Sequence, residues 1–186
     1  MGKGENSLFD QIVGEIAHAL NEVIPETVEK LADMILAHRR IFVAGAGRSG
    51  MMMKAFSMRL MHLGLETYVV GETVTPAIIG TDLLVIGSGS GETASIISMA
   101  SKAHRLGACL SLVTMYSNSA IGRLADYVIV IEASTPKGSG LVKSIQPMGS
   151  LFEQCLLIIM DLVVLQIMEF KKMKADDLYL RHANLE

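Results

Sequence analysis

The chain of 186 residues is 51% hydrophobic, and its 16 basic and 19 acidic residues give a net charge of −3. This apolar content suits one compact domain with a full core, and the length is too short for two ordinary domains. The slight negative charge, without any cluster of basic and aromatic residues, argues against a nucleic-acid partner.

The first forty residues predict two helices ahead of a sheet. Apolar residues recur at helical spacing as far as Leu20, and Pro25 suits the first turn of a second helix with Leu31 and Ile35 on its apolar face. We therefore expect N-terminal helices over residues 1–38. The opening residues are polar and lack the apolar core of a secretory signal, which argues against export.

Short apolar runs after Arg40 predict five strands with helices between them. The predicted strands are Ile41–Ala44, Thr67–Val70, Leu83–Ile86, Cys109–Val113 and Tyr127–Ile131. The predicted helices are Met51–His62, Thr93–Leu106 and Ser119–Leu124, and residues 71–81 are expected to form a loop. Continuous apolar strands that alternate with helices indicate a parallel sheet covered on both faces. We predict an α/β fold, a three-layer doubly wound domain with five parallel strands in the order 2-1-3-4-5.

After the last strand, the Gly and Pro residues of 133–148 predict a loop that covers a site. A long helix is then expected from Ser150 to Lys171. Its residues are apolar on nearly every face, which predicts burial on several sides and contact with another subunit. Because Asp161 and Gln166 interrupt its apolar stretch, we expect it to fall short of a membrane span.

Two turns rich in Gly and Ser indicate where a ligand binds. Gly45–Gly50 (GAGRSG) and Ser88–Thr93 (SGSGET) each follow a predicted strand and each open a predicted helix. Glycines allow backbone N–H groups to approach a ligand, and the helix N-terminus behind each turn attracts an anion. In the strand order 2-1-3-4-5 both turns lie where the winding direction reverses, the usual ligand crevice of such sheets. The sequence therefore predicts a site for a phosphorylated small molecule.

A dinucleotide is the alternative ligand at this point. Gly45, Gly47 and Gly50 match the G-x-G-x-x-G spacing, and Glu72 follows the second strand, where a ribose would be held. Against this, the hydroxyls of the second turn suit a compact phosphate monoester, and the chain leaves little room for a separate substrate domain. We favour a sugar phosphate. The Walker pattern is absent, because Met51 follows Gly50.

The candidate binding residues all lie in these two turns: Gly47, Arg48, Ser49, Ser88, Ser90, Gly91 and Thr93. Arg48 is placed to bind phosphate or to stabilise an anionic oxygen. The alternative interpretation is that Arg48 is a solvated surface side chain without a role in binding. For the serine and threonine residues, the alternative role is helix capping, and a capping residue can also bind a ligand. For Glu92 the expected partner is a sugar hydroxyl or Arg48.

Metal and thiol chemistry are not expected. The histidines are scattered and do not form a group with carboxylates, so no metal site is predicted. Cys109 and Cys155 lie in apolar segments without the spacing of metal ligands or of a C-x-x-C motif. We expect buried, reduced thiols, as suits a cytosolic protein.

Three features of the sequence carry a resemblance to a known family: the pair of turns, the block Gln146–Gln154 (QPMGSLFEQ) and the C-terminal Arg181–Glu186 (RHANLE). The second turn is typical of the sugar-isomerase (SIS) domain superfamily. The two other blocks are similar to those of its 6-phospho-3-hexuloisomerase family, and the likeness runs from Ile41 to Glu186. The resemblance implies one SIS domain over residues 1–186, with N-terminal helices over 1–38, a sheet core and long helix over 40–170, and a C-terminal helical tail over 171–186.

The resemblance also implies an activity. D-arabino-3-hexulose 6-phosphate and D-fructose 6-phosphate would be interconverted through a cis-enediol, in the ribulose monophosphate route of formaldehyde fixation or detoxification. No metal or cofactor is implied. The implied protein is a cytoplasmic homotetramer without a membrane partner, with possible functional pairing to a 3-hexulose-6-phosphate synthase.

Two catalytic residues follow from this resemblance. Glu153 would be the base that takes a proton from C2 and returns one to C3, whereas its spacing from Ser150 alone favours a capping box at a helix start. His182 lies in a polar tail where disorder is the default expectation. The resemblance implies that His182 reaches an active site, that of a neighbouring subunit, and there moves protons between O2 and O3 or polarises the carbonyl.

Other functions remain open at this stage. Another SIS isomerase would act on arabinose 5-phosphate or sedoheptulose 7-phosphate, and the tail motif argues against both. A sugar-phosphate sensor that lacks catalysis is a different class. Such sensors commonly carry a helix-turn-helix domain, for which the segment before the first strand is too short and too acidic.

Overall fold

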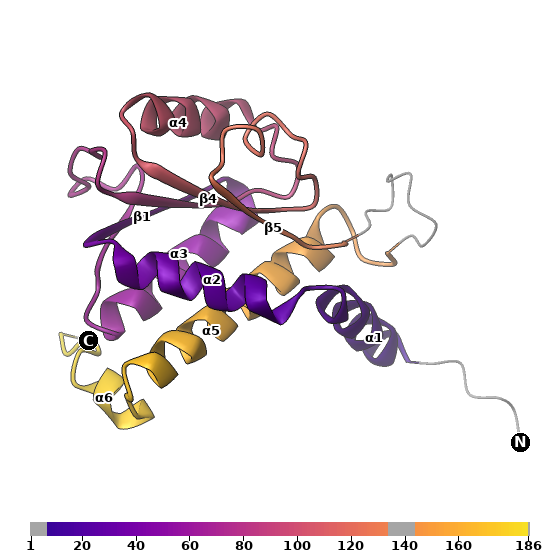
Figure 1. Cartoon of the computed structure of the whole chain (residues 1–186). Helices are drawn as coiled ribbons and strands as arrows, with labels where there is room; N and C mark the ends of the chain where they lie inside the picture. The colour runs from indigo at the N-terminus through magenta and orange to yellow at the C-terminus, as the bar shows by residue number, and fades with distance from the viewer. Residues whose placement is uncertain (1–6, 134–143, 186) are drawn as a thin grey trace, which may run out of the picture.

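The computed structural model describes residues 7–133 and 144–185, so most of the predicted loop over 133–148 lies outside the described residues. Its centre is a five-stranded parallel sheet in the order β2-β1-β3-β4-β5 (Figure 1). The strands are β1 Arg40–Gly45, β2 Glu66–Val69, β3 Leu83–Gly87, β4 Cys109–Thr114 and β5 Tyr127–Val130. The predicted strands and their order are confirmed.

Helices cover both faces of this sheet. They are α1 Leu8–Asn21, α2 Pro25–Ala37, α3 Gly47–His62, α4 Ala94–Arg105, α5 Ser150–Phe170 and α6 Ala175–Tyr179. Figure 1 shows α2, α3 and α5 on one face and α4 on the other, while α1 and α6 lie at the two ends of the α5 layer. The predicted three-layer, doubly wound α/β architecture is confirmed.

The core is divided by the sheet, as a strand buried on both faces requires. Val43 of β1 belongs to the larger apolar cluster, which packs the sheet against α2, α3 and α5. Its neighbour Phe42 belongs to the cluster on the α4 side. Successive side chains of a strand point to opposite faces, and both faces of this sheet are covered. Both Phe42 and Val43 are therefore buried, and the sequence of the strand is continuously apolar.

Two predicted elements differ from the structure. The helix predicted from Met51 begins at Gly47, so Arg48 lies in its first turn rather than in the loop before it. The helix predicted over Ser119–Leu124 is a series of turns. The amide of Ile121 donates to Gly91 O, and a Cβ on Gly122 would lie 2.0 Å from Ser117 O, so local contacts hold this short segment in a tighter path.

The long helix α5 is a core element. By length and composition alone, α5 could cross a membrane, and among the described residues it is the one helix that meets this test. The expectation that it falls short of a membrane span is wrong by that measure. Half of its most apolar 18-residue window is nevertheless buried inside the protein, where it packs against α2 and α3. Leu162 and Leu165 remain exposed on its outer side.

Candidate active site

The two glycine-rich turns leave the same edge of the sheet side by side. Gly45, the last residue of β1, is the register partner of Gly87, the last residue of β3. A Cβ on Gly50 would lie 2.6 Å from Gly45 O, so the start of α3 packs directly onto the end of β1. The amides of the first turn of α3 therefore face the crevice at the carboxyl ends of β1 and β3.

The second turn is built around Gly91. This residue has a φ of 61°, and a Cβ there would lie 2.0 Å from Ser119 Oγ, so only glycine fits. The Gly91 N–H donates to Ser88 Oγ over 3.2 Å, and the Glu92 N–H donates to Ser90 Oγ over 3.2 Å. Ser88 and Ser90 thus shape the turn and do not cap α4, whose N-cap is Thr93, so their capping alternative is wrong. Ser90 is exposed.

Three other predicted binding residues have unused hydrogen-bonding groups or open space beside them. Thr93 is the N-cap of α4, but its side chain makes no capping bond. The Ser49 hydroxyl, at the buried start of α3, has no hydrogen bond to another of the described residues. Gly47 has a φ of 56° and open space where a Cβ would be. The hydroxyls of Ser49 and Thr93 therefore keep donors that the described residues do not use, and Gly47 has open space beside it.

Two acidic residues have protein partners. Glu92 Oε1 accepts from the Ala120 N–H over 2.6 Å, whereas Arg48 lies beside Glu153, so the expected pairing of Glu92 with Arg48 is wrong for this structure. A sugar hydroxyl as the partner of Glu92 stays a prediction. Glu72, which supported the dinucleotide alternative, accepts from Lys54 Nζ over 2.5 Å, with both side chains about half exposed. Neither carboxylate faces the crevice unpaired.

Arg48 connects the first turn to the start of α5. Its Nη1 donates to Ser150 Oγ over 2.9 Å and lies 3.1 Å from Glu153 Oε2. The Arg48 side chain is 49% exposed, whereas that of Glu153 is 16% exposed. The packing of α3 against α5 therefore places a half-exposed guanidinium beside a mostly buried carboxylate, next to the predicted phosphate turns.

The capping-box alternative for Glu153 is wrong. The N-cap of α5 is Gly149, without a side-chain capping bond, and Ser150 is the first helical residue. The Ser150 N–H instead donates to Pro147 O over 3.2 Å. The sequence analysis did not name Ser150 as a site residue, although it lies in the QPMGSLFEQ block.

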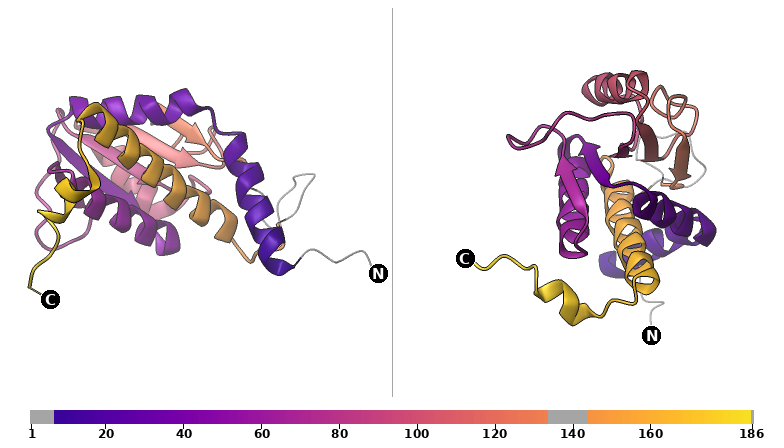
Figure 2. Two further views of the ribbon diagram at one scale, coloured as in Figure 1. Left: turned by 90° about the horizontal axis from the view of Figure 1, so that it is seen from below. Right: turned by 60° about the vertical axis from the view of Figure 1, so that its left-hand side comes forward.

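His182 does not join this cluster within one chain. Its ring stacks on His62, the last residue of α3, with a centroid separation of 5.6 Å. The helical rise of about 1.5 Å per residue puts His62 about 20 Å from Arg48 along α3. Figure 2 shows the tail at the end of α5 remote from its first turn. Burial and the charges of Arg59 and His182 lower the pKa of His62.

The thiols and the acidic groups indicate no further chemistry. Cys109 and Cys155 are free, and burial raises the pKa of the Cys155 thiol to about 11, as an inert core residue requires. In the described part of the chain, no group of three His, Cys, Asp or Glu side chains is arranged to hold a metal ion.

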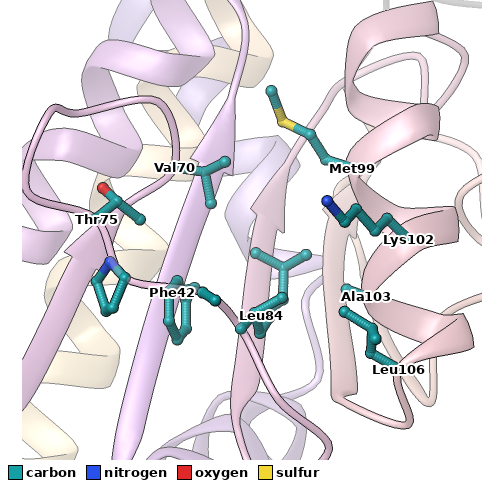
Figure 3. Close-up of a pocket in the computed structure, with 11 residues that line it drawn as sticks. Phe42, Val70, Thr75, Leu84, Met99, Lys102, Ala103 and Leu106 are labelled. Atoms are coloured by element: carbon teal, nitrogen blue, oxygen red, sulfur yellow. The ribbon is translucent and has the colours of Figure 1, made fainter.

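A cavity of about 250 Å³ lies away from the cluster of Arg48 and Glu153, on the α4 side of the sheet. Figure 3 shows Phe42 and Leu84 on its floor, and Met99 and Lys102 on its α4 wall. Its lining is mostly apolar and includes none of the residues predicted to bind a sugar phosphate.

A parallel sheet with two glycine-rich turns at its reversal point defines a doubly wound α/β domain of the class that binds anionic ligands at helix N-termini. The SIS domain model matches residues 34–158, and the chain belongs to the SIS domain family. The resemblance seen in the sequence is thus confirmed.

Within this family the chain is similar to proteins named 3-hexulose-6-phosphate isomerase, a synonym of 6-phospho-3-hexuloisomerase. It is 46% identical to that of Bacillus subtilis, over 95% of this chain and 96% of the relative. It is 42% identical to that of Mycobacterium gastri, over 92% of this chain and 86% of the relative. A crystal structure of a Methanococcus jannaschii protein, for which a 3-hexulose-6-phosphate isomerase function was inferred, superposes with a TM-score of 0.84 at 34% identity, over 96% and 98% of the two chains.

Proposed function

We propose that this chain is a ketose-phosphate isomerase that interconverts D-arabino-3-hexulose 6-phosphate and D-fructose 6-phosphate in the ribulose monophosphate route. The relatives at 46% and 42% identity support this substrate pair. The structural observation that carries the proposal is the convergence of Arg48, Ser150 and Glu153 beside the two anion turns. A carboxylate and a guanidinium in one place are the groups that an enediol mechanism needs.

The phosphate of the substrate binds the two turns. Backbone N–H groups at the start of α3, beside Gly47, and around Gly91 supply donors, and the helix dipoles of α3 and α4 favour the dianion. The hydroxyls that add hydrogen bonds are those of Ser49, Ser88, Ser90 and Thr93. The sugar then extends toward α5, where Glu153 lies.

Glu153 moves the proton between the two carbons. Its carboxylate takes the proton from C2, the C–H electron pair forms the C2=C3 double bond, and the carbonyl pair moves onto O3. The negative charge on this oxygen is stabilised by Arg48. The same carboxyl group then delivers a proton to C3 on the same face, the O2 hydroxyl loses its proton to O3, and the C2 carbonyl forms. One carboxylate serves both steps because C2 and C3 are adjacent.

His182 transfers the proton from O2 to O3 in the site of a neighbouring subunit. The distance between its position at the end of α3 and Glu153 of the same chain supports this arrangement. The exposed Leu162 and Leu165 of α5 support a homo-oligomer, which we propose to be a tetramer located in the cytoplasm. Functional pairing with a 3-hexulose-6-phosphate synthase would supply the substrate.

The direct test supplies the substrate enzymatically. Purified protein is incubated with ribulose 5-phosphate, formaldehyde and a separate hexulose phosphate synthase, and fructose 6-phosphate is measured by a coupled assay. We expect product with the native chain and a loss of about 10²–10⁴-fold in Glu153→Gln. Arabinose 5-phosphate and sedoheptulose 7-phosphate are assayed in parallel. Turnover of one of these alone, or sugar-phosphate binding without any turnover, would contradict the proposal.

A further inference from the structure

A carboxylate of the first helix holds the segment that leads into α5. Glu15 Oε2 accepts from Ser144 Oγ over 2.7 Å and from Gln146 Nε2 over 3.1 Å, and its Oε1 accepts from the Ile145 N–H over 2.7 Å. Ser144 and Gln146 are buried, and the Gln146 N–H also donates to Ser144 Oγ over 3.0 Å. A single side chain thus binds three consecutive residues just before the candidate active site.

These contacts are strong for their type. Hydrogen bonds to an ionised carboxylate are roughly twice as strong as those between neutral groups. Burial opposes the ionisation of Glu15, but the bonds from Ser144, Ile145 and Gln146 outweigh it and lower the pKa of this carboxyl. Glu15 is therefore ionised at neutral pH, as the three donors require.

The chain between Gln146 and Glu153 is short and constrained, so it transmits this anchoring. Pro147 has a restricted φ, and Met148 has a left-handed φ of 55°, which is unfavourable for a side chain of its size. The Ser150 N–H closes the turn onto Pro147 O, and the Glu153 N–H donates to Gly149 O over 3.0 Å. A strained turn persists only where its surroundings hold it, and Glu15 binds the residues directly before it.

We propose that Glu15 is a positioning residue, which fixes the turn before α5 so that Ser150 and Glu153 lie within reach of Arg48. Glu15 does not touch the reacting atoms. Among the described residues, the hydrogen-bond partners of Glu15 all lie in the segment before α5, and none lies in the two phosphate turns that follow β1 and β3. Loss of the carboxylate therefore disturbs the proton transfer more than the binding of phosphate.

This inference rests on the proposed isomerase function, and its test begins with kcat and KM of Glu15→Ala. We expect kcat to fall about 10–10²-fold, as for a small misplacement of a catalytic group, with KM changed by less than about threefold. Glu15→Gln keeps an acceptor for the Ile145 N–H and should recover part of kcat. Glu22→Ala is the matched control, because Glu22 lies at the end of the same helix, is exposed, and has no side-chain hydrogen bond to another described residue.

Three further measurements separate the possible failures. Hydrogen exchange of the Ile145 amide should become faster in Glu15→Ala and not in Glu22→Ala, and circular dichroism checks that each variant folds. An unchanged kcat, or a rise in KM alone, in a folded Glu15→Ala protein would overturn the inference. A native chain without isomerase activity would instead defeat the proposed function. In that case the ¹³C resonance of the Glu153 carboxyl tests the positioning role of Glu15 separately. A resonance that shifts in Glu15→Ala and not in Glu22→Ala supports this role, and an unshifted resonance in Glu15→Ala refutes it.

Discussion

At the scale of single residues, Arg48 has contacts that suit two successive roles. Its guanidinium lies 3.1 Å from Glu153 and is half exposed. Because the Arg48 side of this ion pair is in contact with water, a bound sugar phosphate can compete with Glu153 for the guanidinium. Once water is excluded, the same charge acts on the oxygen that becomes negative. The contact with Ser150 keeps the side chain directed toward α5 in the meantime.

Arg48→Lys should therefore damage catalysis although it retains the charge. In the native chain Nη1 alone contacts Ser150 and Glu153, which leaves the other guanidinium N–H groups for the substrate oxygen. A lysine has a single nitrogen and lacks these further donors, so we expect kcat/KM to fall about 10–10²-fold in steady-state assays. Arg39→Lys is the matched control, because Arg39 is 89% exposed and contacts Glu66 away from the site. Equal activities for the two variants would remove Arg48 from the mechanism.

The glycines of the two turns make a second comparison possible. Gly47 and Gly91 both have positive φ, but a Cβ meets open space at Gly47 and lies 2.0 Å from Ser119 Oγ at Gly91. Gly47→Ala should lower the free energy of unfolding by about 1–2 kcal/mol, the conformational term alone. Gly91→Ala should lower it further and weaken phosphate binding. Urea unfolding measures the difference, and equal losses in the two variants would show that the contact with Ser119 relaxes freely.

At the scale of elements, the sequence predicts what local patterns determine. Apolar runs such as Leu83–Ile86 indicate strands buried on both faces, and the two turns indicate the neighbouring strands β1 and β3. The contact of Arg48 with Glu153 depends on how α3 packs against α5, which no local spacing encodes. For the same reason the capping-box pattern at Ser150 is misleading, since the helix begins after Gly149 and the carboxylate binds Arg48.

An ion pair joins β1 to the segment before β3 at the amino edge of the sheet. Arg40 Nη2 lies 2.6 Å from Asp82 Oδ2, next to the first register pair of β1 and β3, and Asp82 is 2% exposed. Burial opposes the ionisation of Asp82, but hydrogen bonds from Arg40 and from the Ile79 N–H outweigh it and lower the pKa of this carboxyl below its ordinary 3.8. The pair therefore stabilises the fold fully above the unfolded pKa, and this contribution is lost as pH falls through the folded pKa.

Asp82→Asn should accordingly lower the Tm by several degrees at neutral pH. The difference from the native chain should stay constant down to about pH 5 and shrink on further acidification, because the native carboxylate is then protonated. Thermal unfolding over this pH series measures it. A gap that widens toward acid pH would assign the stabilisation to another group.

At the scale of the whole molecule, the two residues proposed for proton transfer lie at opposite ends of the layer formed by α3 and α5. Glu153 lies at the first turn of α5, while His182 is held beside His62 at the opposite end of α3. The intervening helices are rigid, so this fold does not bring the two side chains together by a local rearrangement. A second copy can supply the imidazole, because symmetric assembly places the tail of one subunit beside another.

Mixing two inactive variants tests this division. Glu153→Gln and His182→Ala chains are coexpressed, and the mixed oligomers are purified and assayed. If each site combines Glu153 of one chain with His182 of another, random assortment restores roughly a quarter of the native activity, because some sites then receive both intact residues. If each chain used its own His182, every site would lack one residue and mixing would restore nothing. The His182→Ala homo-oligomer provides the baseline, and its oligomeric state, measured by light scattering, shows whether the tail is also needed for assembly.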